Sequence, residues 1–133
     1  MSKKSESLTL AQLAVLEQSP PKPNELRPSF AVAMGWLQGR APELQDAIAE
    51  RAELGLKRYG MYLQPNNGRC AITDCIQESL DKLNYLAQEW VEASISNNPF
   101  EKEIMEDFWD EVEKISRLCK RLEWKWANEQ TNG

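Results

Sequence analysis

Two pairs of acidic residues with helical spacing stand on either side of a basic loop in this chain, which contains no histidine. Glu50 and Glu53 form the first pair, and Glu78 and Asp81 form the second. Side chains three residues apart lie on one face of a helix, so each pair presents two carboxylates together. Two such helices packed side by side would bring four carboxylates to one place, where divalent cations would stabilise them best. The pattern therefore predicts a site for hard metal ions.

A basic loop lies between the two acidic pairs. It follows Lys57 and Arg58, contains the sequence Asn66-Asn67-Gly68, and ends at Arg69. Surface lysines and arginines are often no more than solvated charges, and cations at the end of a helix also interact favourably with its dipole. Beside a metal site, however, the same side chains suit phosphate binding through charge-assisted hydrogen bonds. The two features together predict metal-assisted chemistry on a phosphate.

Acidic pairs of this spacing are common in the chain, so the spacing alone is weak support for a metal site. Most such pairs form only a solvated helix face. The two pairs beside the loop differ in context, because the loop makes their helices neighbours in a helical hairpin and places both pairs at similar distances from it. The remaining pairs have no such partner helix with basic residues nearby, and they are Glu43/Asp46, Glu89/Glu92, Glu103/Glu106, Asp107/Asp110 and Asp110/Glu113.

The absence of histidine excludes several kinds of site. Catalytic triads that use imidazole cannot form, nor can a di-iron site built from Glu-x-x-His pairs. Cys70, Cys75 and Cys119 are odd in number and lack Cys-x-x-Cys spacing, which indicates reduced thiols rather than zinc ligands. The remaining ligand set is all oxygen, and such a set suits Mg²⁺ or Mn²⁺.

Helical periodicity runs through most of the chain and no strand pattern is present, which predicts an all-α fold. Pro42 suits the first position of a helix, and Gly60 suits the position after the end of one. The last apolar stripe would extend roughly 40 Å, a length that suits a helical bundle or a dimer interface. The expected helices cover residues 8–18, 30–37, 42–59, 70–94 and 99–126.

Length and composition indicate one globular domain. We expect an N-terminal arm over residues 1–28, with a short helix and a proline-rich tether, then a helical domain over 29–128 and a disordered tail over 129–133. The net charge of −5 argues against a general nucleic-acid surface. No apolar run reaches the ~18 residues of a membrane span and the polar start is unlike a signal peptide, so the sequence predicts a soluble cytoplasmic protein.

The acidic pairs and the loop together resemble the MazG-like all-α nucleoside triphosphate pyrophosphohydrolases. The resemblance covers roughly residues 43–90, where 24 residues separate Glu53 from Glu78. Within that family, the segment is most similar to bacteriophage members of the MazZ type, which hydrolyse dATP and dGTP in phages that replace adenine with 2-aminoadenine. The residues that carry it are Glu50-Arg51, Gly55, Lys57-Arg58-Tyr59-Gly60, Asn67-Gly68-Arg69, Asp74, Gln77-Glu78, Asp81 and Asn84-Tyr85-Leu86.

This resemblance implies a homo-oligomer, either a dimer or a tetramer, built on four-helix MazG-like cores. It implies two or three Mg²⁺ or Mn²⁺ ions per site, bound by the four carboxylates. The expected reaction is hydrolysis of purine deoxynucleoside triphosphates between the α- and β-phosphates, with dGTP preferred to dATP. The products would be the monophosphate and pyrophosphate, and dGMP would supply the synthesis of the 2-aminoadenine nucleotide in the host cytoplasm.

Expected roles follow from that mechanism. Glu50 or Glu53 would take the proton of a water molecule activated by the metal ions. Basic side chains would stabilise charge on the departing pyrophosphate, and polar groups on the second acidic helix would orient phosphate or sugar. Trp36 is a candidate for stacking on the base, although tryptophans at mostly apolar helix positions more often fill a core. The expected substrate-binding residues are Lys57, Arg58, Arg69, Asn84, Tyr85 and Trp36.

A rival hypothesis is a non-enzymatic oligomerisation or adaptor protein, joined through the apolar stripe of residues 99–126. It explains the long last helix and the acidic surface equally well. It does not explain two acidic pairs around a basic loop. Release of pyrophosphate from nucleotides in the presence of Mn²⁺ would discriminate between the two hypotheses.

Overall fold

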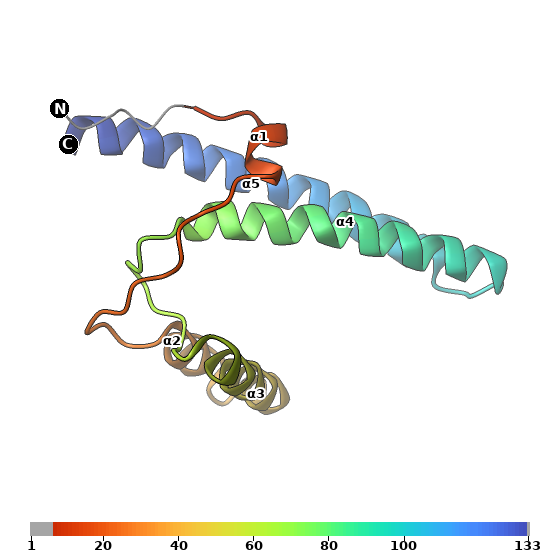
Figure 1. Cartoon of the computed structure of the whole chain (residues 1–133). Coiled ribbons are helices and arrows are strands. Elements are labelled where there is room, and N and C mark those ends of the chain that lie inside the picture. Colours follow the sequence, from red (N-terminus) through yellow and green to blue (C-terminus); the bar gives the residue numbers. More distant parts are fainter. Residues whose placement is uncertain (1–6, 133) are drawn as a thin grey trace. The chain divides into compact units, whose positions relative to one another are not determined.

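The structure is a computed structural model that describes residues 7–132, with the side chains of residues 7–129. Every regular element in this range is an α-helix, which confirms the predicted all-α fold (Figure 1). None of the described helices is long and apolar enough to cross a membrane. The elements are α1 (Leu10–Ala14), α2 (Ser29–Leu37), α3 (Pro42–Tyr59), α4 (Ala71–Ile95) and α5 (Glu101–Asn132).

The chain divides into two compact units whose positions relative to each other are not determined. One comprises residues 1–17 and 70–133 and is called here the α4–α5 unit. The other comprises residues 18–69 and is called the α2–α3 unit. The sequence pattern instead predicted an arm at residues 1–28 followed by one helical domain at residues 29–128. In the structure α1 belongs to the α4–α5 unit, and the proline-rich segment belongs to the α2–α3 unit.

The α4–α5 unit is an antiparallel pair of long helices with the short α1 packed on α4 (Figure 1). Its first core cluster contains Leu13 of α1, Ile76 of α4, and Leu118 and Leu122 of α5. Ile76 is fully buried, and burying such a side chain contributes about 1.5–3 kcal/mol to stability. A second cluster, Leu86, Ala93 and Ile104, lies nearer the turn between the two helices. Apolar residues at helical spacing on α4 and α5 therefore meet along most of the pair.

Local signals fix where the helices of this unit begin and turn. Thr9 caps α1 by accepting a hydrogen bond from the backbone of Gln12, whose side chain accepts one from the backbone of Thr9. Between α4 and α5, Asn97 adopts a positive φ of 53° and the backbone of Phe100 donates to the Asn98 side chain. The helix α5 extends to Asn132, beyond the expected end near Trp126, so residues 129–132 continue it.

The α2–α3 unit is a helical hairpin followed by the basic loop (Figure 1). Pro42 stands at the first turn of α3, and Gly60 ends the helix with a φ of 76°, as the sequence predicts. The Gln45 side chain donates to the Met34 carbonyl at 2.8 Å, which joins the two helices. Within the described part of this unit no hydrophobic side chain is fully buried. The apolar side chains between the two helices are therefore at most half-buried.

Candidate functional site

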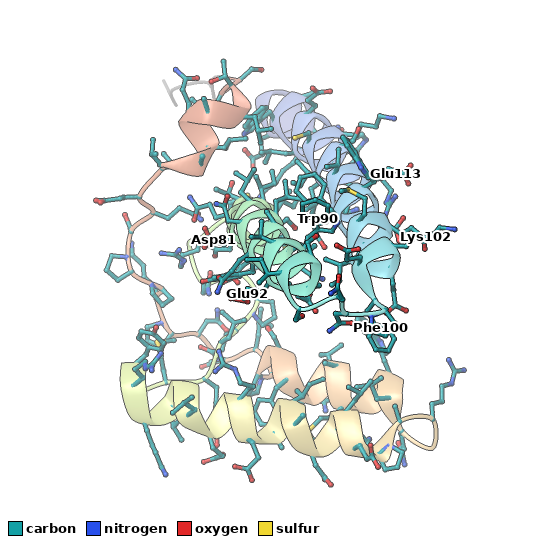
Figure 2. The ribbon with its side chains drawn as sticks, turned by 90° about the vertical axis from the view of Figure 1, so that its right-hand side faces the viewer. Asp81, Trp90, Glu92, Phe100, Lys102 and Glu113 are labelled. Carbon is teal, nitrogen blue, oxygen red and sulfur yellow. The ribbon has the colours of Figure 1, made fainter. Side chains whose placement is uncertain are left out.

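The second acidic pair lies on the exposed surface of α4. Glu78 and Asp81 are both exposed, one helical turn apart. Asp81 lies on the side of α4 turned away from α5 (Figure 2). Asn84 and Tyr85, which follow one turn later, are also exposed, with 67% of the Tyr85 surface accessible. This part of α4 thus presents two carboxylates, an amide and a phenol to the solvent.

A hollow of about 750 Å³ borders Asp81 within the α4–α5 unit. Its walls are mostly apolar, and its lining includes Leu16, Leu80 and Phe108. Asp81 and Asn84 supply polar atoms at its edge. Sites for small organic ligands commonly combine apolar walls of this extent with a few polar groups. The hollow could therefore receive an apolar or aromatic group beside the carboxylate.

Gln77 fixes one wall of this hollow. Its side-chain amide donates to the carbonyls of Leu13 and Leu16, at 2.9 and 2.8 Å. Leu13 lies in the last turn of α1, where its carbonyl also accepts from the Leu16 backbone at 3.3 Å, and Leu16 follows the end of the helix. The bonds attach α1 to α4 directly beside Asp81. This role of Gln77 could not be predicted from the sequence, because its bonds depend on a contact between distant parts of the chain.

The first acidic pair lies on α3 in the other unit. Glu50 and Glu53 are exposed, as are Lys57 and Arg58 at the end of the same helix. The hydroxyl of Tyr62 donates to Glu53 at 2.5 Å. This hydrogen bond, together with burial and the negative charge of Glu53, raises the pKa of the Tyr62 hydroxyl. Tyr62 therefore stays neutral and holds one oxygen of Glu53 in place.

Tyr62 was not predicted from the sequence to be a partner of Glu53. Its ring packs against Phe30 of α2, with ring centroids 4.9 Å apart. The backbone of Ser29 also donates to the Leu63 carbonyl at 2.8 Å, so the loop after α3 folds back against the start of α2. The only sequence feature that pointed to Tyr62 was its position as an aromatic residue in a polar loop. Its partners could not be deduced from the local sequence pattern.

Hydrogen bonds join the basic loop to the proline-rich segment. Asn24 bonds with the Gln64 side chain and with the carbonyls of Pro65 and Asn66, and the Lys22 backbone donates to Asn67 at 2.7 Å. Asn66 adopts a positive φ of 51°, a conformation that asparagine tolerates better than most residues. The segment expected to be a loose tether is therefore bound to the loop through many polar contacts.

Arg69 closes this arrangement. Its guanidinium donates to the backbone carbonyls of Gln18 and Ser19, at 3.3 and 3.1 Å. Its backbone N–H donates to the side chain of Asn67, which is buried. The expected role of Arg69 in binding pyrophosphate remains a prediction, and the structure adds a role in holding the loop.

The tryptophans lie at more exposed positions than a core role would require. Trp36 on α2 exposes 75% of its surface, and Trp109 on α5 exposes 59%. The alternative that Trp36 fills a core is wrong, whereas Trp126 does pack against the first core cluster. Trp36 is accessible to a ligand, and stacking on a base remains a prediction for it.

A buried carboxylate near the second acidic pair was not predicted from the sequence. Glu111 of α5 is only 4% exposed and lies 3.2 Å from Lys82 and 3.7 Å from Lys114. Burial alone would raise the pKa of Glu111, but hydrogen bonds from Ser79 and Lys82 and the charges of both lysines outweigh it and lower the pKa. Lys82, next to Asp81 in the chain, is therefore held toward α5.

No three aspartate, glutamate or cysteine side chains gather closely enough to hold a metal ion among the residues that the structure describes. Each acidic pair by itself supplies two carboxylates, a ligand type that fits Mg²⁺ or Mn²⁺. The predicted four-carboxylate site draws on both units, so it stays a prediction. Comparisons of the chain with protein-family models, curated proteins and solved structures find no match.

Proposed function

We propose that this protein is a metal-dependent nucleoside triphosphate pyrophosphohydrolase with a MazG-like core. The observation that carries the proposal is the pair of acidic helix faces, Glu50/Glu53 on α3 and Glu78/Asp81 on α4, separated by a basic loop. All four carboxylates are exposed and so accessible to metal ions and substrate. The resemblance of residues 43–90 to that family supports the same reaction.

The four carboxylates would hold Mg²⁺ or Mn²⁺, two or three ions per site. When bound, these ions neutralise the triphosphate and lower the pKa of water so that it can attack phosphorus. One oxygen of Glu53 accepts a hydrogen bond from the Tyr62 hydroxyl, and this bond holds the carboxylate in one orientation. Glu50 is then the better candidate to accept the proton from water, since no side chain among the described residues bonds to its carboxylate.

The basic residues would bind the departing pyrophosphate. Lys57 and Arg58 are exposed at the end of α3, and Arg69 stands at the end of the loop that follows. Charge-assisted hydrogen bonds from these groups would stabilise the charge that develops on the leaving group. The hollow beside Asp81 offers apolar walls for the sugar or base, with Asn84 at its edge.

The proposed substrates are purine deoxynucleoside triphosphates, with dGTP preferred to dATP, and the dGMP product would serve 2-aminoadenine nucleotide synthesis in a phage. This preference rests on the resemblance alone. A panel of eight nucleoside triphosphates, assayed for monophosphate and pyrophosphate with Mg²⁺ or Mn²⁺, tests it. Equal turnover of all purines and pyrimidines would leave a general pyrophosphohydrolase, and faster turnover of pyrimidines would reject the purine assignment.

Site variants test the assignment of the carboxylates. We expect Glu78→Gln and Asp81→Asn to abolish hydrolysis while the helical content is retained, because each removes a metal ligand. Glu89→Gln is the matched control, since Glu89 is an exposed carboxylate on the same helix with the same spacing to a second acidic residue. Full activity in Glu78→Gln, or activity that survives exhaustive chelation, would reject the metal site.

The adaptor hypothesis has one observation in its favour. Trp109 and Trp124 of α5 are largely exposed, as expected of a helix that binds another protein. An inactive protein that nevertheless forms stable oligomers would support it.

A further inference from the structure

The helix α5 carries opposite charges in its two halves. Residues 101–113 contain seven acidic residues, of which Glu111 is buried, and one lysine, whereas residues 114–125 contain five basic residues and one glutamate. The helix dipole favours acidic residues at the start of a helix and basic residues at its end, but only within the first and last turns. The separation of charge in α5 extends far beyond those turns.

This separation sets like charges beside each other along the helix. Glu106 and Asp110 are four residues apart in the acidic half, and Arg117 and Arg121 are four residues apart in the basic half. Like charges at this spacing destabilise an isolated helix. The ion pair Lys82–Glu111 with α4 involves the buried side of α5. A partner with the opposite order of charges would turn this repulsion into attraction.

The charged residues form a continuous stripe. At 3.6 residues per turn, Glu106, Asp110, Glu113, Arg117 and Arg121 follow one another along one side of α5. All five side chains are exposed. The residues of α5 buried against α4, such as Ile104, Ile115 and Leu122, lie on the opposite side. Figure 2 shows Glu113 on the outer side of α5, away from α4.

We propose that a second copy of this chain docks antiparallel along the exposed stripe of α5. A two-fold axis between residues 113 and 114 would place Asp110 of each copy opposite Arg117 of the other, because both lie equally far from that point. Glu106 would approach Lys120 across the same axis. Such an isologous interface uses one self-complementary surface on both copies.

A second copy fits the stripe better than other partners with charge. A nucleic acid would meet the basic half favourably, but the acidic half would repel its phosphates. A partner of one sign would satisfy only half of the stripe. Trp109 and Trp124, which are 59% and 68% exposed beside the stripe, would add the aromatic contact area that is common in protein interfaces. The inference does not depend on the proposed enzymatic function.

Charge-swap variants of the full-length chain test the proposal by sedimentation velocity. Asp110→Arg alone and Arg117→Asp alone should each weaken dimerisation by about tenfold or more, since like charges then face each other twice per dimer. The combined variant, with both changes in one chain, should restore the dissociation constant to within about threefold of the original. Glu89→Arg, an equal change of charge on α4, is the control and should leave the dissociation constant unchanged. Far-UV circular dichroism checks that each variant keeps its helical content.

Carbodiimide cross-linking gives a second measurement that does not depend on variants. Glu106 and Lys120 lie about 21 Å apart within one straight helix, which is too far for a direct amide bond. A cross-linked peptide that joins them, found only in the dimer band, would support the antiparallel pairing. A protein that is monomeric at 100 µM and low salt, roughly a hundredfold above a micromolar dissociation constant, would overturn the proposal. A dimer insensitive to both single reversals, or a dimer without the 106–120 link, would overturn it as well.

Discussion

Replacement of Glu111 by glutamine should destabilise the α4–α5 unit, and the size of the effect follows from the environment of the carboxylate. Glu111 is 4% exposed and contacts Lys82 at 3.2 Å and Lys114 at 3.7 Å. Glutamine has nearly the same shape and can still accept the hydrogen bond from Ser79. The substitution therefore removes the negative charge with little change in packing.

The expected loss is roughly 1–2 kcal/mol at neutral pH, the difference between charge-assisted and neutral hydrogen bonds. It stays below the cost of breaking a fully buried ion pair, because about half of each lysine side chain is exposed and remains hydrated. For a chain of this size the loss corresponds to a decrease in Tm of roughly 3–8 °C. Exposed Glu92→Gln on α4 is the control and should change Tm by less than about 2 °C.

The dependence on pH gives this prediction a second test. The folded protein lowers the pKa of Glu111 below its ordinary value of 4.5, so it stabilises the ionised form. That contribution is complete above the ordinary pKa and is lost as pH falls through the lowered value. The original protein should therefore lose stability more steeply below about pH 4.5 than the glutamine variant does. Equal Tm values at pH 7, with parallel curves down to pH 3, would refute this reasoning.

Three further predictions concern individual residues. Ile76→Ala should destabilise the α4–α5 unit by about 2–5 kcal/mol, as measured by urea unfolding, because it leaves a cavity where the side chain is fully buried; a loss under 1 kcal/mol would contradict the described core. Gly60→Ala should destabilise the α2–α3 unit by about 1 kcal/mol, since Gly60 has a φ of 76°. Gly55→Ala, within α3 and with open space around it, should instead stabilise that unit by about 0.5–1 kcal/mol. Hydrogen exchange measures the stability of the unit in both variants, and a change of the same sign in both would contradict the described backbone. Cys70 should be alkylated by iodoacetamide at lower pH than Cys119. Burial raises the pKa of the Cys70 thiol, but hydrogen bonds with Thr73 and the charge of Lys125 outweigh burial and lower that pKa. Burial and the charge of Glu123 both raise the pKa of the Cys119 thiol. Peptide mass spectrometry after alkylation across pH 6 to 10 (spanning the ordinary thiol value of about 8.5) measures the order, and the reverse order would exclude the described surroundings.

Local signals explain why much of the fold could be predicted from the sequence. Pro42 and Gly60 bound α3 through properties of their own backbones, and the apolar spacing on α4 and α5 follows from helix geometry. These features depend on residues a few positions apart. Prediction of the helices and of their exposed acidic faces therefore needed no knowledge of the tertiary arrangement.

Features that depend on distant contacts could not be predicted. The Tyr62–Glu53 bond requires the loop to fold back against α2, and the burial of Glu111 requires the register of α5 against α4. Trp36 is a large apolar residue of the kind that often fills a core, yet it is exposed in the structure. Its exposure depends on which side chains pack against the hairpin, and the local sequence does not determine them. The meeting of the two acidic pairs likewise depends on the arrangement of α3 and α4, which the helical spacing within each pair does not specify.

The order of the two units along the chain has a consequence for folding. The α2–α3 unit is inserted between α1 and α4, so the Gln77–Leu16 bond must close a loop of 61 residues. Closing such a loop costs about 3.6 kcal/mol of chain entropy beyond a constant. The Arg69–Gln18 bond already spans 51 of those residues when the α2–α3 unit has folded, which reduces the cost to about 2 kcal/mol. Folding of the inserted unit thus favours docking of α1 through chain connectivity alone, without any contact between the units.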